Sequence, residues 1–338
     1  MSTNRQWTVG IPNDDPGGMC LAPGHFVARE GTVPEPGEGE ILIRAHYFSP
    51  DPMNHAWVRG MPGKFDALPP GSVMRGGIAG RIVASRNPRW QVGDVVTGFL
   101  DWADYSLSNG TDHLGVPLYK VPEGFDPATG LATLGMTGLC AWLGLVDIGK
   151  PQPGDTVLVS GASGGIGSLA GQIAKLSGAR VVGIAGGQEK CALLGRMGFD
   201  ATVDYKLPGL VERIAEACPD GADVFFDNVG GSLLDAALVN MAVGGRIVIC
   251  GAVAHYGAEP TPIFNHMQLA VRSVTMAGFF YFNLVNRWPE GRARLATWLK
   301  DGLISETLDI AEGFESVPDA AISQFHGGVS GRKLVRIN

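Results

Sequence analysis

Cysteine and histidine are scarce in this chain, and neither residue type forms a close cluster. The five cysteines, at positions 20, 140, 191, 218 and 250, contain no Cys-x-x-Cys pair, and their odd number does not suit a disulfide framework. The seven histidines show no His-x-x-His spacing. We therefore expect buried, reduced thiols and no metal site, because zinc is held by clustered Cys and His ligands.

Positive charge and long apolar runs are also lacking. With 26 Lys and Arg against 33 Asp and Glu, the formal net charge is -7, whereas nucleic-acid binding requires clustered basic residues. No stretch approaches the roughly 18 consecutive apolar residues that cross a membrane, and residues 1–7 lack the apolar core of a signal peptide. We therefore expect a cytoplasmic protein that binds neither nucleic acid nor membrane.

What the sequence does contain, from about residue 126 to residue 299, is a regular alternation of short apolar runs and helical patterns. The apolar, β-branched runs predict buried parallel strands at 156–159, 180–185, 201–204, 223–226, 246–249 and 273–279. The helical patterns predict helices at 166–176, 189–197, 210–217 and 232–241. Such alternation is typical of an α/β fold, so we predict a doubly wound (Rossmann) parallel sheet over 126–299.

Residues 1–125 show a different pattern, in which strand-like runs are separated by proline and glycine. These runs lie at 40–45, 80–84 and 93–98. They predict a compact, mostly β module with long loops, and the length of 338 residues suits two domains. The tail at 333–337 also has the pattern of a strand, whose place in the fold the pattern alone leaves open.

A glycine-rich loop, Ser160 to Gly167, follows the first predicted strand and precedes the first predicted helix. Its glycines at 161, 164 and 167 stand three apart. Glycine lets backbone N–H groups approach a pyrophosphate, and the helix that follows offers the positive end of its dipole. In this strand–turn–helix context we predict dinucleotide binding, and a tight turn without a ligand is the alternative.

The end of the second predicted strand lacks an acidic residue. NAD-binding domains usually place Asp or Glu there to hold the ribose 2′-hydroxyl, whereas residues 184–188 read Ile-Ala-Gly-Gly-Gln. Glu189 falls in the first turn of the next helix, and Lys190 follows it. Lys190 is either a partner for a 2′-phosphate or a solvent-facing helix residue. We favour NADP(H) over NAD as the cofactor.

Further motifs, spread over nearly the whole chain, are characteristic of one family. They lie at 49–52, 74–83, 92–96, 134–139, 186–191, 226–231 and 250–256. With them the chain resembles the zinc-independent medium-chain dehydrogenase/reductase family, in the branch of prostaglandin reductases and NADPH-dependent 2-alkenal reductases. The resemblance implies a GroES-like catalytic domain over 1–125, completed by 300–338, with the cofactor in the cleft between the domains. Relatives are commonly homodimers.

The resemblance also implies which residues bind the cofactor and the substrate. The pyrophosphate would lie on Gly164, Gly165, Ile166 and Gly167, and the 2′-phosphate on Lys190 and Tyr205. The nicotinamide half would contact Asn228, Cys250, Gly251, Ala252, Tyr256, Phe279, Phe280 and Tyr281. The substrate pocket would be lined by Tyr47, Met53, His55 and Trp57.

The chain departs from the family pattern in three places. After Pro52 it reads Met-Asn-His-Ala-Trp, which alters the pocket wall. Residues 329–332 read Val-Ser-Gly-Arg where the family often has Asn before a Gly-Lys pair, so one expected cofactor hydrogen bond is affected. Residues 13–24, rich in Asp, Pro and Gly, are longer than usual and are expected to form a surface loop.

The reaction implied by the family is reduction of a carbon–carbon double bond conjugated to a carbonyl group, in an α,β-unsaturated ketone or aldehyde. Hydride would add to the β-carbon, and the resulting enolate oxygen would need a hydrogen-bond donor. Tyr256, acting with the ribose 2′-hydroxyl, is the expected donor, because a phenol donates while neutral at pH 7. Packing over the ribose is the alternative role for Tyr256, and His55 and His255 are weaker candidates as proton donors.

Other functions of the same cofactor were weighed against this reaction. A short-chain dehydrogenase needs Tyr-x-x-x-Lys, and no tyrosine of this chain has a lysine four residues later. A quinone oxidoreductase of the same fold would share the hydride donor and the cleft, so it stays open. So does a non-enzymatic NADPH-binding protein whose residues 53–57 close the substrate site.

Overall fold

The computed structural model describes residues 3–11, 20–61, 63–255, 261–325 and 330–337. The chain divides into two compact units. The first comprises Met1–Leu131, Asp309–Val329 and Lys333–Asn338, and the second comprises Ala132–Leu308 and Ser330–Arg332. Each unit has its own sheet, and each is described by itself below.

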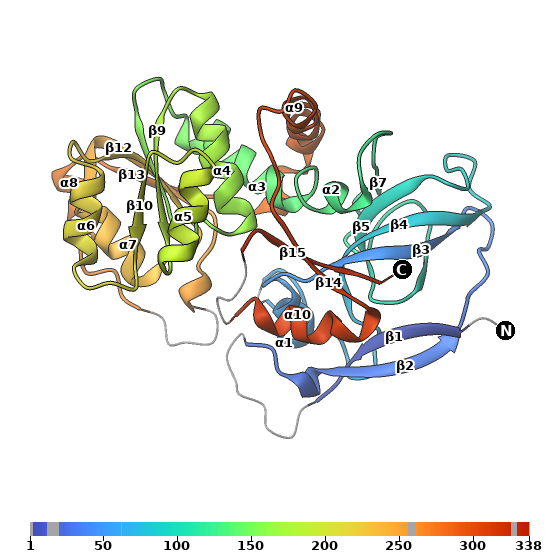
Figure 1. Ribbon diagram of the computed structural model, residues 1–338. Coiled ribbons are helices and arrows are strands. Elements are labelled where there is room, and N and C mark those ends of the chain that lie inside the picture. The colour runs from blue at the N-terminus through green and yellow to red at the C-terminus, as the bar shows by residue number, and fades with distance from the viewer. Residues whose placement is uncertain (1–2, 12–19, 62, 256–260, 326–329, 338) are drawn as a thin grey trace. The chain divides into compact units, whose positions relative to one another are not determined.

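The second unit is built on a six-stranded sheet in which each pair of neighbouring strands is parallel (Figure 1). The order across the sheet is β10-β9-β8-β11-β12-β13. The strands are β8 (Thr156–Val159), β9 (Arg180–Ala185), β10 (Ala201–Asp204), β11 (Ala222–Asp227), β12 (Met241–Ile249) and β13 (Thr275–Gly278). The chain runs from the middle to one edge and then back to the other, which is the doubly wound topology with its switch point beside β8.

Helices connect these strands and cover the sheet. They are α3 (Met136–Leu143), α4 (Gly165–Leu176), α5 (Gln188–Arg196), α6 (Leu210–Ala217), α7 (Gly231–Leu238), α8 (Gln268–Val271) and α9 (Trp288–Lys300). Fully buried side chains such as Leu158, Val182 and Phe225 form part of the core between strands and helices. The helix predicted to reach residue 241 ends at Leu238. Met241 instead begins β12, where it is fully buried next to Ala222.

The first unit is mostly β. Its larger sheet has the order β14-β15-β3-β4-β5-β7, with β6 also paired to β3, and β1 and β2 form a separate hairpin. The strands are β1 (Thr3–Val9), β2 (Phe26–Thr32), β3 (Ile41–Ser49), β4 (Arg75–Ser85), β5 (Val95–Asp101), β6 (Tyr105–Ser108), β7 (Tyr119–Lys120), β14 (Leu308–Glu312) and β15 (Arg332–Arg336). The short helices α1 (Asn54–Arg59), α2 (Pro127–Leu131) and α10 (Val317–Ser323) complete it. The predicted fold class, a Rossmann domain plus a mostly β domain, is confirmed.

The unit boundaries follow from the packing of two segments. Helix α2 contacts β3, β4 and β5, so the first unit extends to Leu131 rather than to residue 125. The side chain of Gln172 on α4 accepts a hydrogen bond from the amide of Ser305 at 2.8 Å and donates to the Ser305 carbonyl at 3.0 Å. Residues 300–308 therefore belong to the second unit. The tail strand β15 pairs antiparallel with β3, with Val335 opposite Phe48.

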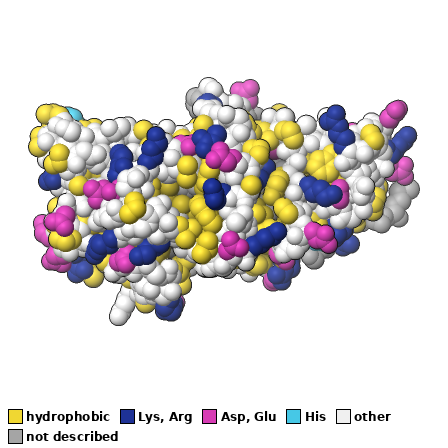
Figure 2. Space-filling model, turned by 90° about the horizontal axis from the view of Figure 1, so that it is seen from above, with side chains coloured by type: hydrophobic (Ala, Val, Ile, Leu, Met, Phe, Trp, Pro, Cys, Tyr) yellow, Lys and Arg dark blue, Asp and Glu magenta, His cyan; other side chains and the backbone are white. Residues whose placement is uncertain are grey.

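The surface carries both signs of charge. On the face that Figure 2 shows, basic and acidic side chains are interspersed, and hydrophobic side chains lie between them. Among the described residues, no helix has both the length and the hydropathy that crossing a membrane requires.

Candidate nucleotide-binding site

The glycine-rich loop lies between β8 and α4, at the carboxyl end of β8. Gly161 adopts a left-handed φ of 56°, which glycine accepts without strain. A Cβ added to Gly167 would lie 2.3 Å from the carbonyl oxygen of Gly161. The first turn of α4 therefore packs directly on the loop, and only glycine fits at position 167.

The start of α4 presents backbone N–H groups rather than side chains. Gly164 is the N-cap, and it makes no side-chain cap hydrogen bond. The first N–H groups of a helix have no intrahelical partner, and the helix dipole favours an anion beside them. The four residues predicted to bind pyrophosphate, Gly164 to Gly167, thus form one helix start that is suited to an anion.

The segment Ser330–Arg332 lies against this loop. The amide of Gly331 donates to the Ser163 carbonyl at 2.8 Å, and the amide of Arg332 donates to the Thr307 carbonyl at 2.7 Å. Gly331 has a φ of 79°, and a Cβ there would lie 2.3 Å from the oxygen of Thr307. The departure from the family pattern at 330–332 therefore falls next to the predicted pyrophosphate site.

A buried carboxylate joins the ends of the central strands. Asp227, at the end of β11, accepts a hydrogen bond from the Ser160 hydroxyl at 2.6 Å and another from the Gly230 amide at 3.0 Å. Burial raises the pKa of Asp227, although these hydrogen bonds act in the opposite direction. The side-chain amide of Asn228 donates to the Ser160 carbonyl at 2.8 Å. Asn228 and the glycine loop are thereby held side by side, through a carboxylate that the sequence analysis did not single out.

The predicted 2′-phosphate residues lie at the ends of β9 and β10. The amide of Tyr205 donates to the Ala185 carbonyl at 3.1 Å, and its ring lies over Gly186, where a Cβ would come within 2.8 Å of the ring. Burial, followed by the charge of Lys206, lowers the pKa of Lys190. The structure thus brings Lys190 and Tyr205 to one edge, together with a second cation, Lys206, that the sequence analysis missed.

An acidic residue does lie at this edge, but on β10 rather than β9. Asp204 accepts hydrogen bonds from the amide of Gly187 at 2.8 Å and from the amide of Lys206 at 3.0 Å. These two hydrogen bonds lower the pKa of Asp204. Its carboxylate therefore orders the loop after β9, and this role could have been anticipated from the Asp at the end of the third predicted strand.

Comparison with known proteins identifies the family. Models described as N-terminal domain of oxidoreductase and zinc-binding dehydrogenase match residues 13–116 and 165–297. The NADPH-dependent curcumin reductase of Escherichia coli (strain K12) is 36% identical over 99% of this chain and 97% of its own length. The NADP(+)-dependent 2-alkenal reductase of Nicotiana tabacum is 36% identical over 90% of this chain and 89% of its own length. The chain belongs to the zinc-independent medium-chain dehydrogenase/reductase family.

A solved structure of this family agrees with the fold. The crystal structure of CurA in complex with NADPH from Vibrio vulnificus matches with a TM-score of 0.89 and 33% identity, covering 99% of each chain. The branch predicted from the motifs, that of prostaglandin reductases and 2-alkenal reductases, is confirmed. Although one matching model is named for zinc, no group of three or more His, Cys, Asp or Glu within the described part of the chain could hold a metal ion.

Two buried polar atoms test whether the second unit suits the family's nucleotide. The Thr137 hydroxyl and Nε2 of His255 are both buried, and neither has a hydrogen-bond partner among the described residues. Thr137, near the start of α3, borders the loop, since its Cγ2 lies 3.0 Å from where a Cβ of Gly165 would be. Buried polar groups are ordinarily satisfied, so an unpaired hydroxyl beside an anion-binding helix start fits a bound phosphate or ribose oxygen. The residues fit NADP(H).

The residues predicted for the nicotinamide half follow β12 and β13. The amides of Cys250 and Gly251 donate to the Asp227 carbonyl at 2.8 and 3.1 Å, which keeps 250–252 next to Asn228. The Cys140 side chain and burial raise the pKa of Cys250 well above its ordinary value. Tyr281 is 8% exposed and stacks on Trp288 with ring centroids 4.2 Å apart.

The aromatic residues after β13 pack within the second unit. Phe279 lies near Gly144, where a Cβ would come within 3.0 Å of its ring, and Phe280 contacts Phe282 with ring centroids 5.5 Å apart. Of the remaining predictions, Tyr256 and Val329 lie outside the described residues, as does most of the loop expected at 13–24.

The four predicted pocket residues all belong to the first unit. The Tyr47 hydroxyl on β3 accepts a hydrogen bond from Nε of Arg336 at 3.0 Å. Met53 is the N-cap of α1, and a ring nitrogen of His55 bonds to the Pro52 carbonyl. Trp57 is 3% exposed, and its indole N–H is buried without a hydrogen-bond partner in the described part of the chain. The structure therefore places Met53, His55 and Trp57 together in α1 and its cap.

Proposed function

We propose that this chain reduces the carbon–carbon double bond of α,β-unsaturated ketones and aldehydes with NADPH. The observation that carries the proposal is the likeness to the NADPH-dependent curcumin reductase, which extends over 99% of the chain. The nucleotide edge of the second unit supports it, because Lys190, Tyr205 and Lys206 gather there and Asp204 is bonded to backbone amides.

The cofactor residues keep the roles expected from the sequence. Backbone amides at the start of α4, from Gly164 to Gly167, bind the pyrophosphate, and Lys190 and Tyr205 hold the 2′-phosphate. Asn228 and residues 250–252, fixed through Asp227, contact the nicotinamide half with Phe279, Phe280 and Tyr281. Tyr47, Met53, His55 and Trp57 line the pocket for the apolar part of the substrate.

NADPH, when bound, supplies the hydride that adds to the β-carbon of the substrate. Tyr256 donates a hydrogen bond to the carbonyl oxygen, where negative charge develops as the enolate forms. Its phenol stays neutral at pH 7, so it donates without first having to be deprotonated or protonated. The proton that completes the α-carbon comes from water.

Steady-state rates test the proposal. Purified enzyme is assayed by NADPH oxidation with curcumin, simple enones, 2-alkenals and quinones, each repeated with NADH. We expect kcat/KM to be highest for enones or enals with NADPH. Higher values for quinones would instead favour the quinone oxidoreductase, and tight NADPH binding without turnover of any substrate would favour a non-enzymatic NADPH-binding protein.

A homodimer and a cytoplasmic location are part of the proposal. At one edge of the six-stranded sheet, β13 and the preceding segment carry exposed apolar side chains, among them Phe264 and Val271, each 71% exposed. Pairing of this edge with a second copy would cover them. The free thiols of Cys140 and Cys250 suit a reducing compartment. Light scattering of the wild type and of Val271→Lys tests the dimer, which the lysine should weaken.

A further inference from the structure

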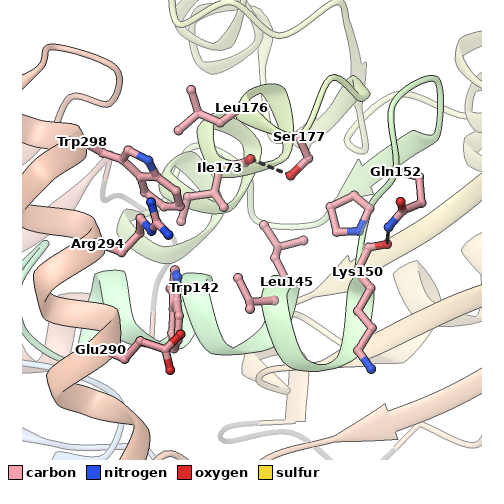
Figure 3. A pocket seen from close by; sticks show the side chains of 12 residues that line it. Trp142, Leu145, Lys150, Gln152, Ile173, Leu176, Ser177, Glu290, Arg294 and Trp298 are labelled. Carbon is pink, nitrogen blue, oxygen red and sulfur yellow. Dashed lines mark hydrogen bonds between the residues drawn. The ribbon is translucent and has the colours of Figure 1, made fainter.

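An open groove lies on the second unit, where three helical segments meet. It has a volume of about 480 Å³ and is lined from α3, from the π-helical turn Gly144–Gly149, from the end of α4 and from α9. Figure 3 shows Trp142, Leu145 and Ile173 in its middle, with Leu176 beside them. This volume lies in the range of small-molecule sites, and the middle of the groove is apolar.

Two cations flank the apolar middle. Arg294 on α9 lies at one side, with its guanidinium 5.9 Å from the ring centroid of Trp298, and Lys150 lies at the other side (Figure 3). Within the described residues, neither Arg294 nor Lys150 forms an ion pair with a carboxylate. The one acid of the lining, Glu290, is bonded to Arg287 at 3.1 Å. The groove therefore offers positive charge beside apolar surface.

The backbone at Lys150 is unusual for a lysine. Its φ of 45° and ψ of 53° are left-handed, a conformation that glycine ordinarily occupies after a helix. The amide of Lys150 donates to the Leu145 carbonyl at 2.6 Å, and its carbonyl accepts from Gln152 at 3.0 Å, which holds this conformation. Such strain, like a π-helical turn, is concentrated at functional sites in proteins.

The groove is separate from the nucleotide loop. Helix α4 begins at the loop with Gly165 and reaches the groove with Leu176, its last residue. Its 12 residues span about 18 Å at the usual rise per residue. A ligand in the groove and a pyrophosphate at the loop would therefore not compete for the same atoms.

We propose that this groove binds an amphiphilic carboxylate, such as a medium-chain fatty acid. Its apolar chain lies on Trp142, Leu145 and Ile173, and its carboxylate contacts Arg294, whose planar guanidinium suits two carboxylate oxygens. Lys150 adds attraction for the anion from the other side. A neutral hydrocarbon would leave both cations without a counter-charge, and a cationic amphiphile would be repelled.

Dodecanoate, below its micellar concentration, is the probe. Its binding to full-length enzyme saturated with NADP⁺ is measured by calorimetry. Arg294→Gln and Lys150→Gly should each weaken binding about two- to fivefold, as expected for an exposed ion pair. The glycine suits the left-handed backbone at 150, so the fold is kept. Val146→Asp, at a groove position that is 39% exposed, should weaken binding more than Val146→Asn does.

Lys300→Gln is the matched control, because Lys300 lies on α9 but does not line the groove. Its affinity for dodecanoate should equal that of the wild type. The proposal is overturned if dodecanoate does not bind the wild type at millimolar concentration, or if the groove variants and Lys300→Gln behave alike. It is also overturned if Val146→Asp changes the mass of the particle but not the affinity, since the groove would then be a contact between copies. Enone reduction is assayed separately and does not bear on these outcomes.

Discussion

Replacing Lys190 by alanine should weaken NADPH binding far more than NADH binding. Lys190 lies in the first turn of α5, and burial and the neighbouring Lys206 lower its pKa. A charge-assisted hydrogen bond from this partly desolvated ammonium group to a 2′-phosphate would contribute about 1.5–3 kcal/mol. We therefore expect the Kd for NADPH to rise about 10- to 150-fold. The Kd for NADH, which lacks the phosphate, should stay nearly constant.

The same contact should depend on pH. The phosphate binds the protonated lysine, so binding raises the pKa of Lys190 in the complex. NADPH affinity is therefore full below the pKa of the free enzyme, and it falls as the pH rises through that lowered pKa. It should fall again below about pH 6, where a phosphate monoester gains its second proton. NADH affinity should show neither change.

Calorimetric titration of the apoenzyme with NADPH and NADH measures both effects. Lys206→Ala should cost only about two- to fivefold for NADPH, because Lys206 is exposed. Lys175→Ala is the control: this lysine pairs with Asp200 at 2.9 Å and lies near the other end of α4. Equal losses of NADPH and NADH affinity in Lys190→Ala would refute the 2′-phosphate assignment.

Three further substitutions test the rest of the site. Tyr256→Phe should lower kcat with little change in NADPH affinity, and an unchanged kcat would leave Tyr256 a packing role. Gly167→Ala should destabilise the enzyme by about 1–3 kcal/mol in urea unfolding, since the new Cβ would lie 2.3 Å from a carbonyl oxygen. Gly195→Ala, in a helix with open space around it, should stabilise by about 0.5–1 kcal/mol. Thr137→Val should leave the apoenzyme at least as stable, because it removes an unpaired hydroxyl, yet raise the Kd for NADPH about fivefold; an unchanged Kd would exclude this hydroxyl from the site.

The strands of the Rossmann unit were predictable because each is a short apolar run between glycines or polar turns. β8, β9 and β10 have the predicted bounds, and the glycine spacing located the loop between β8 and α4. The end of α7 was not predictable, because Met241 suits a helix and a buried strand equally well. Its place in β12 is decided by pairing with β11, a contact distant in sequence.

Other parts of the site depend on contacts that local patterns do not encode. Thr137 precedes the loop by more than twenty residues and is placed beside Gly165 by the packing of α3 on α4. Gly331 reaches the loop from the far end of the chain. Lys206 follows a residue that was predicted for the site, so the position of Tyr205 at the end of a strand was the signal that could have identified it.

The position of Gly331 limits how this enzyme can be divided. The chain passes from the second unit to the first between Arg332 and Lys333, directly after the amide that bonds to Ser163. A contiguous fragment ending at Leu308 would hold all six parallel strands but would lack that amide. A fragment, chimera or split version of the nucleotide unit therefore needs 330–332 supplied through a linker, or its glycine loop will lack one of its backbone supports.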